Sequence, residues 1–104
     1  MDFKFDISNL AEAELDGILD YIIYNLHNPT AARNLFRKMY EAIENVCLFP
    51  LSGAIVGNEF APNKIYRRLM VDNYIVYYEI LEEKKTIYIL RIVYGQRNQE
   101  NILA

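Results

Sequence analysis

The sequence predicts an α+β fold in the order β-α-α-β-β-β, with a four-stranded, antiparallel-rich sheet packed against a helical hairpin. The first half of the chain carries two long stretches with apolar residues at helical spacing, and the second half carries three β-rich runs. The length of 104 residues and the hydrophobic content of 53% fit one core. We therefore expect residues 1–104 to form a single domain.

The first half of the chain predicts a strand and two helices. Residues 3–7 alternate apolar and polar side chains, as in a half-buried strand. Ser8 and Asn9 can cap the helix that follows, and Asn28 and Pro29 suit the start of a second helix, so the short turn between them predicts an antiparallel hairpin. Apolar stripes at helical spacing mark the two helices: Leu15, Ile18, Leu19, Ile22 and Leu26, then Ala32, Leu35, Phe36, Met39, Ile43 and Val46.

The second half predicts a loop and three strands. Residues 50–63 contain two prolines and two glycines and are predicted to form a loop. Three β-rich runs follow, separated by short polar turns: 65–71, 74–81 and 86–94. The last run is apolar on both faces, which predicts a central position in the sheet.

The sequence argues against several classes of protein. Cys47 and His27 are the only cysteine and histidine, so we expect neither an intrachain disulfide nor a metal site. We find no nucleotide-binding glycine motif and expect no cofactor. No apolar run approaches the ~20 residues of a membrane span, and the first residues, MDFKFDISN, do not resemble a signal peptide. We therefore expect a cytoplasmic protein without membrane contact.

The charge is distributed unevenly. The net charge is −3, which argues against a general nucleic-acid coat. The first 52 residues carry eight acidic and four basic side chains, whereas the remaining residues carry six acidic and seven basic ones. The predicted sheet can therefore present a basic face to an anionic partner.

Arginines on the predicted strands are the first candidate site residues. Arg91 lies in the middle of an apolar strand, on the face expected for Ile89 and Val93. A buried guanidinium needs a carboxylate or a cleft, so Arg91 either pairs with Glu79 or another acid, or belongs to an anion or partner site. Adjacent strand residues point to opposite faces, so at most one of Arg67 and Arg68 can join Arg91 on a given face.

Tyr94 is the tyrosine most suggestive of function. Most of the nine tyrosines fit the core of a twisted sheet. Tyr94 is predicted at a strand end, close in sequence to Arg91 and Arg97. A tyrosine beside arginines can stack on a base or serve as a general acid near a phosphodiester.

The order of elements and four short motifs together resemble the RelE/ParE superfamily of bacterial type II toxins. The motifs are Phe49-Pro50 after the second helix and the runs YRRL at 66–69, NYIVYY at 73–78 and ILRIVYGQRN at 89–98. The resemblance covers essentially the whole chain. It implies a small α+β toxin of the plasmid-stabilisation kind, held inactive by a cognate antitoxin encoded beside it. The complex would contact its own promoter DNA only through the antitoxin.

Arg67, Arg68, Arg91 and Arg97 cluster amid aromatic residues, and we expect them to bind the antitoxin or the target. The resemblance leaves the target open. RelE-like members cleave mRNA on the ribosome, and a metal-independent endoribonuclease of that kind would use Arg97, Tyr94 and Arg68. ParE-like members poison DNA gyrase.

Departures from the nuclease pattern favour the ParE-like interpretation slightly. Ile75 stands where the nucleases resemble one another in having an arginine, and the tail after Arg97 has no tyrosine or histidine. The net charge of −3 also suits rRNA docking poorly, and both helices are predicted to be about 17 residues long, as in ParE-like members. Two alternatives stay open: the RelE-like mRNA interferase, and an inactive binding partner without toxicity.

Overall fold

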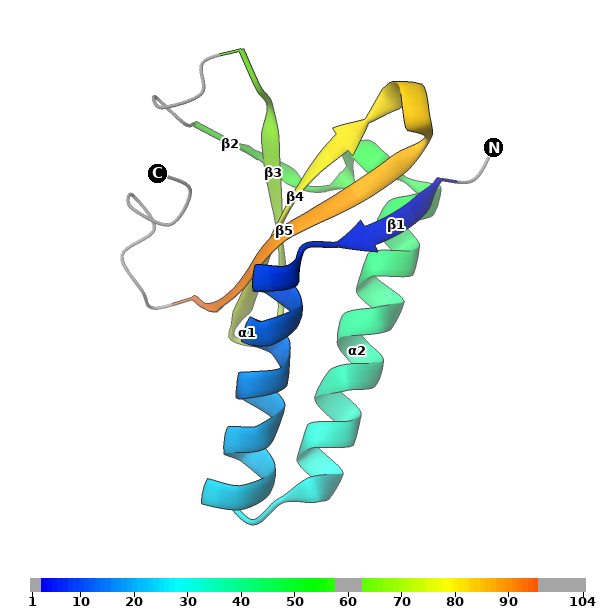
Figure 1. Ribbon diagram of the computed structural model, residues 1–104. Helices are drawn as coiled ribbons and strands as arrows, with labels where there is room; N and C mark the ends of the chain where they lie inside the picture. Colours follow the sequence, from blue (N-terminus) through cyan, green and yellow to red (C-terminus); the bar gives the residue numbers. More distant parts are fainter. Residues whose placement is uncertain (1–2, 58–62, 96–104) are drawn as a thin grey trace.

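The structure is a computed structural model that describes residues 3–57 and 63–95. It confirms the α+β class and the predicted order of elements, with one strand added (Figure 1). The elements are β1 (Lys4–Ile7), α1 (Asn9–Asp20), a π-helical turn η1 (Tyr21–Asn25), α2 (Pro29–Leu48), a 3-10 turn η2 (Pro50–Ser52), β2 (Ala54–Val56), β3 (Tyr66–Val71), β4 (Tyr74–Leu81), a 3-10 turn η3 (Glu82–Lys84) and β5 (Thr86–Tyr94).

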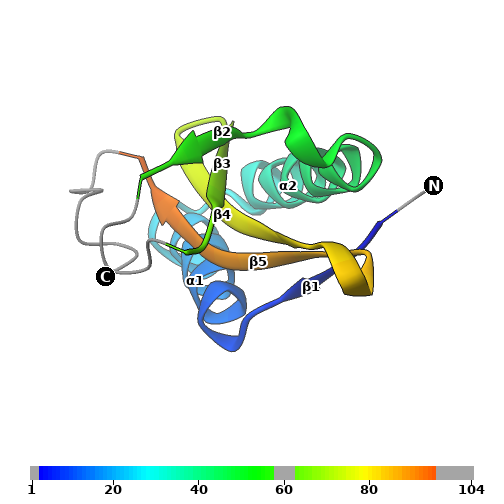
Figure 2. The same ribbon diagram turned by 90° about the horizontal axis from the view of Figure 1, so that it is seen from above.

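The sheet has five strands in the order β1-β5-β4-β3-β2, so the prediction of four strands was wrong (Figure 2). The additional strand, β2, lies within residues 50–63, which were predicted to form a loop. It has only three residues, too few to show an alternating pattern, and it forms by pairing with β3. β1 runs parallel to β5, and the other neighbours are antiparallel, as predicted.

The two helices form the predicted antiparallel hairpin and lie side by side (Figure 1). The hydroxyl of Ser8 accepts a hydrogen bond of 3.0 Å from the Ala11 N–H, and the Asn28 side chain accepts one of 3.0 Å from the Ala31 N–H. Both caps satisfy N–H groups that a first helical turn leaves without partners. Among the described residues, no helix is long and apolar enough to cross a membrane.

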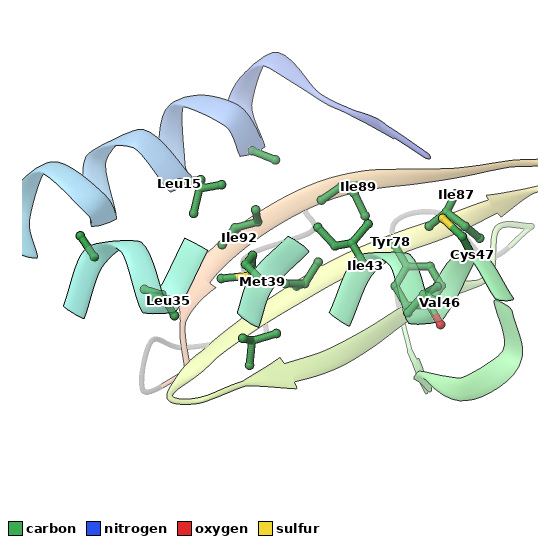
Figure 3. Close-up of a cluster of buried hydrophobic side chains, with 14 of the residues drawn as sticks. Leu15, Leu35, Met39, Ile43, Val46, Cys47, Tyr78, Ile87, Ile89 and Ile92 are labelled. Atoms are coloured by element: carbon green, nitrogen blue, oxygen red, sulfur yellow. The ribbon is translucent and has the colours of Figure 1, made fainter. Parts of the chain in front are cut away.

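The main core lies between the helical hairpin and one face of the sheet (Figure 3). Met39 and Ile43 of α2 meet Ile89 and Ile92 of β5, and all four side chains are at least 96% buried. A smaller cluster of Ile75, Tyr77 and Val93 lies on the opposite face of the sheet, which we call the distal face.

An irregularity in β5 changes which face its residues occupy. Tyr77 pairs with Arg91 and Tyr78 pairs with Ile89, so Leu90 is an extra residue in the ladder. As a result Ile89 and Ile92 both reach the main core, and Val93 lies on the distal face. Arg91 and Val93 therefore share the distal face, as expected, but Ile89 does not, because the bulge at Leu90 breaks the alternation between Ile89 and Arg91.

Side chains of α1 and the residue before it satisfy the edge of β5 beyond the end of β1. β1 pairs with β5 only as far as Ile89. From there the Ser8 hydroxyl donates to the Leu90 carbonyl oxygen at 2.9 Å, and the Ile92 N–H donates to the Glu14 carboxylate at 3.1 Å. The edge that would otherwise expose unpaired backbone groups is therefore bonded to these side chains.

Candidate functional site

Arg91 forms an ion pair with Glu14 of α1. Its Nε lies 3.1 and 3.0 Å from the two carboxylate oxygens, and one Nη lies 2.6 Å from Oε2. The two side chains are only 19% and 15% exposed. The hydrogen bonds that Arg91 donates to the Glu14 carboxylate are the main cause that raises the pKa of Arg91. The ion-pair interpretation of Arg91 is confirmed, with Glu14 as the acid in place of Glu79.

Arg67 and Arg68 point to opposite faces, as predicted. Arg67 pairs in register with Tyr78, which lies in the main core, and its Nη1 donates to the Gly53 carbonyl oxygen at 2.8 Å. The Tyr78 hydroxyl accepts from the Gly53 N–H at 2.9 Å and donates to the Pro50 carbonyl oxygen at 2.8 Å. Arg67 and Tyr78 therefore hold the segment between α2 and β2, and Arg67 lies apart from Arg68.

Arg68, Tyr77 and Arg91 form one cross-strand row, which we call the arginine row. Arg68 pairs with Tyr77 in register, and Tyr77 pairs with Arg91. Directly opposite residues share a face, so the row belongs to the distal face. Arg68 is exposed, whereas Tyr77 is 1% exposed. Burial raises the pKa of the Tyr77 hydroxyl, and the positive charges of Arg68 and Arg91 oppose this increase.

Two further rows border the arginine row on the distal face. On one side the register aligns Met70, Ile75 and Val93, and Met70 is 57% exposed. On the other side it aligns Tyr66, Glu79 and Tyr88. The Glu79 carboxylate is only 14% exposed and lies 4.0 Å from the Lys64 ammonium. The distal face therefore combines guanidinium groups with an apolar row, a pattern that suits a carboxylate-bearing, partly apolar polypeptide segment.

Tyr94 does not join the arginine row. It pairs in register with Tyr74, which packs against the main core, so Tyr94 lies on the helix side of the sheet. The two rings contact edge to face with centroids 5.7 Å apart. The structure thus places Tyr94 and Arg68 on opposite faces. Arg97, the third residue of the predicted nuclease set, lies outside the described residues.

The apolar groove along the outside of the helical hairpin was not predicted from the sequence. Phe36 was predicted as part of the buried stripe of α2, yet its side chain is 49% exposed. The neighbouring Tyr40 is 45% exposed. One hollow of about 590 Å³ runs beside Phe36 between the helices, and a second of about 280 Å³ continues toward β1. The sequence signal that could have predicted the groove is the width of the apolar stripe on α2. The stripe is wider than the sheet can cover, so part of it stays exposed.

The described residues contain no cluster of three or more histidine, cysteine or carboxylate side chains that could hold a metal ion. Among the described residues, the polar groups of the distal face include guanidinium and phenol groups, the carboxylates of Asp6 and Glu79, and the ammonium group of Lys4.

This architecture, with a helical hairpin on one face of the sheet and Arg68 and Arg91 on the other, agrees with a match to a family of small toxins. The model of the ParE toxin of type II toxin–antitoxin systems, parDE, matches residues 5–99. The chain therefore belongs to the ParE toxin family, within the RelE/ParE superfamily of type II toxins. No curated protein sequence matches the chain significantly.

Solved structures support the assignment of the fold. A chain of the chromosomal ParDE toxin–antitoxin system from P. aeruginosa is similar with a TM-score of 0.69 and 22% identity, over 90% of this chain and 97% of that one. A chain of the archaeal RelE–RelB complex from Pyrococcus horikoshii gives 0.64 and 18%, over 94% and 100%. The isolated E. coli RelE toxin gives 0.55 and 17%, over 93% and 88%.

Proposed function

We propose that this toxin acts in the cytoplasm by poisoning DNA gyrase and that a cognate antitoxin neutralises it. The observation that carries the choice of target is the separation of Arg68 from Tyr94 by the thickness of the sheet. Metal-independent RNA cleavage needs groups that take up and deliver protons on both sides of one phosphate. A cation on one face and a phenol on the other do not provide this pair.

Tyr77 is a poor substitute for the missing proton-transfer group. It lies between Arg68 and Arg91, but it is buried, and burial raises the pKa of its hydroxyl. A phenol with a raised pKa does not act as a base near neutral pH. Ile75 stands where RelE-like nucleases have an arginine. Its aliphatic side chain supplies no charge to a substrate, and it is 1% exposed in the smaller cluster on the distal face.

The antitoxin is proposed to cover the distal face. Arg68 is exposed there beside the exposed Met70, so the surface offers charge and apolar area together. A segment with a carboxylate opposite Arg68 and an aliphatic side chain opposite Met70 would bury both. The groove beside Phe36 and Tyr40 gives the same antitoxin a second place to bury an amphipathic helix.

Inducing the chain without its antitoxin separates the three candidate functions. Gyrase poisoning predicts induction of the DNA-damage response and filamentation before protein synthesis falls. An mRNA interferase, the alternative supported by the similarity to RelE structures, predicts an immediate block of translation. Normal growth at high expression would indicate an inactive binding partner. Arg68 is also a candidate for binding the target, so the Arg68→Glu variant should be less toxic at the same expression level and thereby controls for the effect of overexpression itself.

A further inference from the structure

The surface of α1 that faces away from the core carries a second apolar stripe. Its members are exposed and follow one another at intervals of three or four residues: Leu10, Ala13, Gly17 and Tyr21. Residues at this spacing share one face of a helix. The core-facing side of the same helix is formed by Ala11, Leu15 and Ile18. No described segment buries the second stripe, which we call the α1 stripe.

A hollow of about 620 Å³ opens beside the α1 stripe. Gly17 and Tyr21 line one side of it, and Tyr74 and Tyr94 of the sheet line the other. Ile92 also lines the hollow. The site is therefore an aromatic-walled recess at the junction of helix and sheet, and it is large enough for an aromatic or long aliphatic side chain.

Gly17 lines this hollow without a side chain that would fill part of it. A glycine inside a helix costs about 1 kcal/mol relative to alanine. A Cβ added at Gly17 would meet nothing within 4 Å, so no contact within the described chain requires glycine there. Contact with a partner molecule would explain the glycine, because a side chain at position 17 would narrow the recess that the partner enters.

The negative charge beside the α1 stripe favours a positively charged partner. Glu12, Asp16 and Asp20 follow one another at intervals of four residues on the adjacent side of α1, and all three are exposed. Within residues 3–57 and 63–95 none of them makes an ion pair, and the helix from Asn9 to Asn25 carries no lysine or arginine. A second copy of this chain would bring like charges together on this surface.

We propose that the α1 stripe and its acidic row dock a basic, amphipathic segment of a protein partner. An aromatic or long aliphatic side chain of that segment enters the hollow between Gly17 and Tyr94. Lysine or arginine side chains one helical turn apart pair with Asp16 and Asp20. This surface differs from the arginine row, which attracts carboxylates, and the inference holds whichever target the toxin has.

Two synthetic helical peptides of 16 residues test the proposal. They share one stripe of leucine with a central tryptophan and differ only in having lysine or glutamate on both flanks. Each is titrated into the full-length, isotope-labelled chain, and the backbone amide shifts are followed by NMR. The lysine peptide is expected to bind at least about tenfold more tightly than the glutamate peptide and to shift the amides of Gly17, Tyr21 and Tyr94.

Matched variants separate docking from general attraction to an acidic protein. Replacing Asp16 and Asp20 by asparagine should weaken binding of the lysine peptide at least about fivefold. Replacing Glu41 and Glu44 of α2 by glutamine removes the same charge elsewhere and should change it less than about twofold. The Gly17→Leu variant should keep the NMR spectrum of a folded protein and should no longer bind the lysine peptide. Equal binding of both peptides, shifts confined to another surface, or full binding by Gly17→Leu would overturn the proposal.

Discussion

The Glu14 carboxylate on α1 binds two successive residues of β5: it accepts hydrogen bonds from the Arg91 guanidinium and from the Ile92 N–H. The two partners are 77 and 78 positions away in sequence. The contact joins the first helix to the last strand where β1 no longer covers the strand edge. Arg91, a candidate binding residue, therefore also has a structural role.

Removing either member of the pair should destabilise the protein. In Arg91→Ala the carboxylate loses its counter-ion in a site that is 15% exposed, and we expect a loss of about 2 kcal/mol, below the 3–5 kcal/mol typical of a fully buried pair. Glu14→Gln should cost a similar amount. The double variant should lose less than the sum of the two single losses. Urea unfolding at constant slope measures all three, and additive losses would contradict a direct interaction.

The neighbouring residues Arg67 and Arg68 should behave differently when replaced. Arg67→Ala removes the donor to the Gly53 carbonyl oxygen and should lower the free energy of unfolding by about 1–2 kcal/mol. Arg68→Ala alters an exposed side chain and should change it by less than about 0.5 kcal/mol. Arg68→Ala should instead weaken antitoxin binding, measured by calorimetry. The assignment fails if the two variants have the same effect on stability.

Tyr77 and Tyr78 allow the same chemical change to be compared on the two faces. The Tyr78 hydroxyl bonds to Gly53 N–H and to the Pro50 carbonyl, so Tyr78→Phe leaves two polar groups without this partner and should cost about 2 kcal/mol. The Tyr77 hydroxyl is buried without a hydrogen-bond partner among the described residues. Tyr77→Phe should therefore change stability by less than about 0.5 kcal/mol at neutral pH. Chemical unfolding of both variants checks the contrast.

Stability should fall at alkaline pH partly because of Tyr77. Burial raises the pKa of its hydroxyl above the ordinary value of 10.0. The folded protein thus holds this proton to a higher pH than the unfolded chain does. The corresponding stability is fully present below about pH 10 and is lost as the pH rises through the folded value. Tyr77→Phe should lose less stability than the parent between about pH 9 and 11, and parallel curves would contradict this.

The sequence predicted the parts of the fold that local patterns encode. Both N-caps, the hairpin and the three long strands follow from residue spacing and polar caps. β2 was missed because three residues carry no period, and the position of Ile89 relative to Arg91 was missed because a bulge at Leu90 breaks the alternation. The Glu14 partner of Arg91 was missed because the contact joins elements at opposite ends of the chain.

The same bulge limited the prediction of the site. Strict alternation places Ile89, Arg91 and Val93 on one face, whereas in the observed ladder Arg91 and Val93 lie on the distal face and Ile89 lies in the main core. The opposite orientations of Arg67 and Arg68 needed no tertiary information and were predicted correctly.

DNA supercoiling by purified gyrase in the presence of the purified full-length chain tests the proposed function most directly. The account predicts that supercoiling stops and that gyrase-dependent double-strand breaks accumulate, and that cognate antitoxin prevents both. The Arg68→Glu variant should be weaker in the same assay. Unimpaired gyrase, together with cleavage of mRNA on translating ribosomes by the same preparation, would contradict the account.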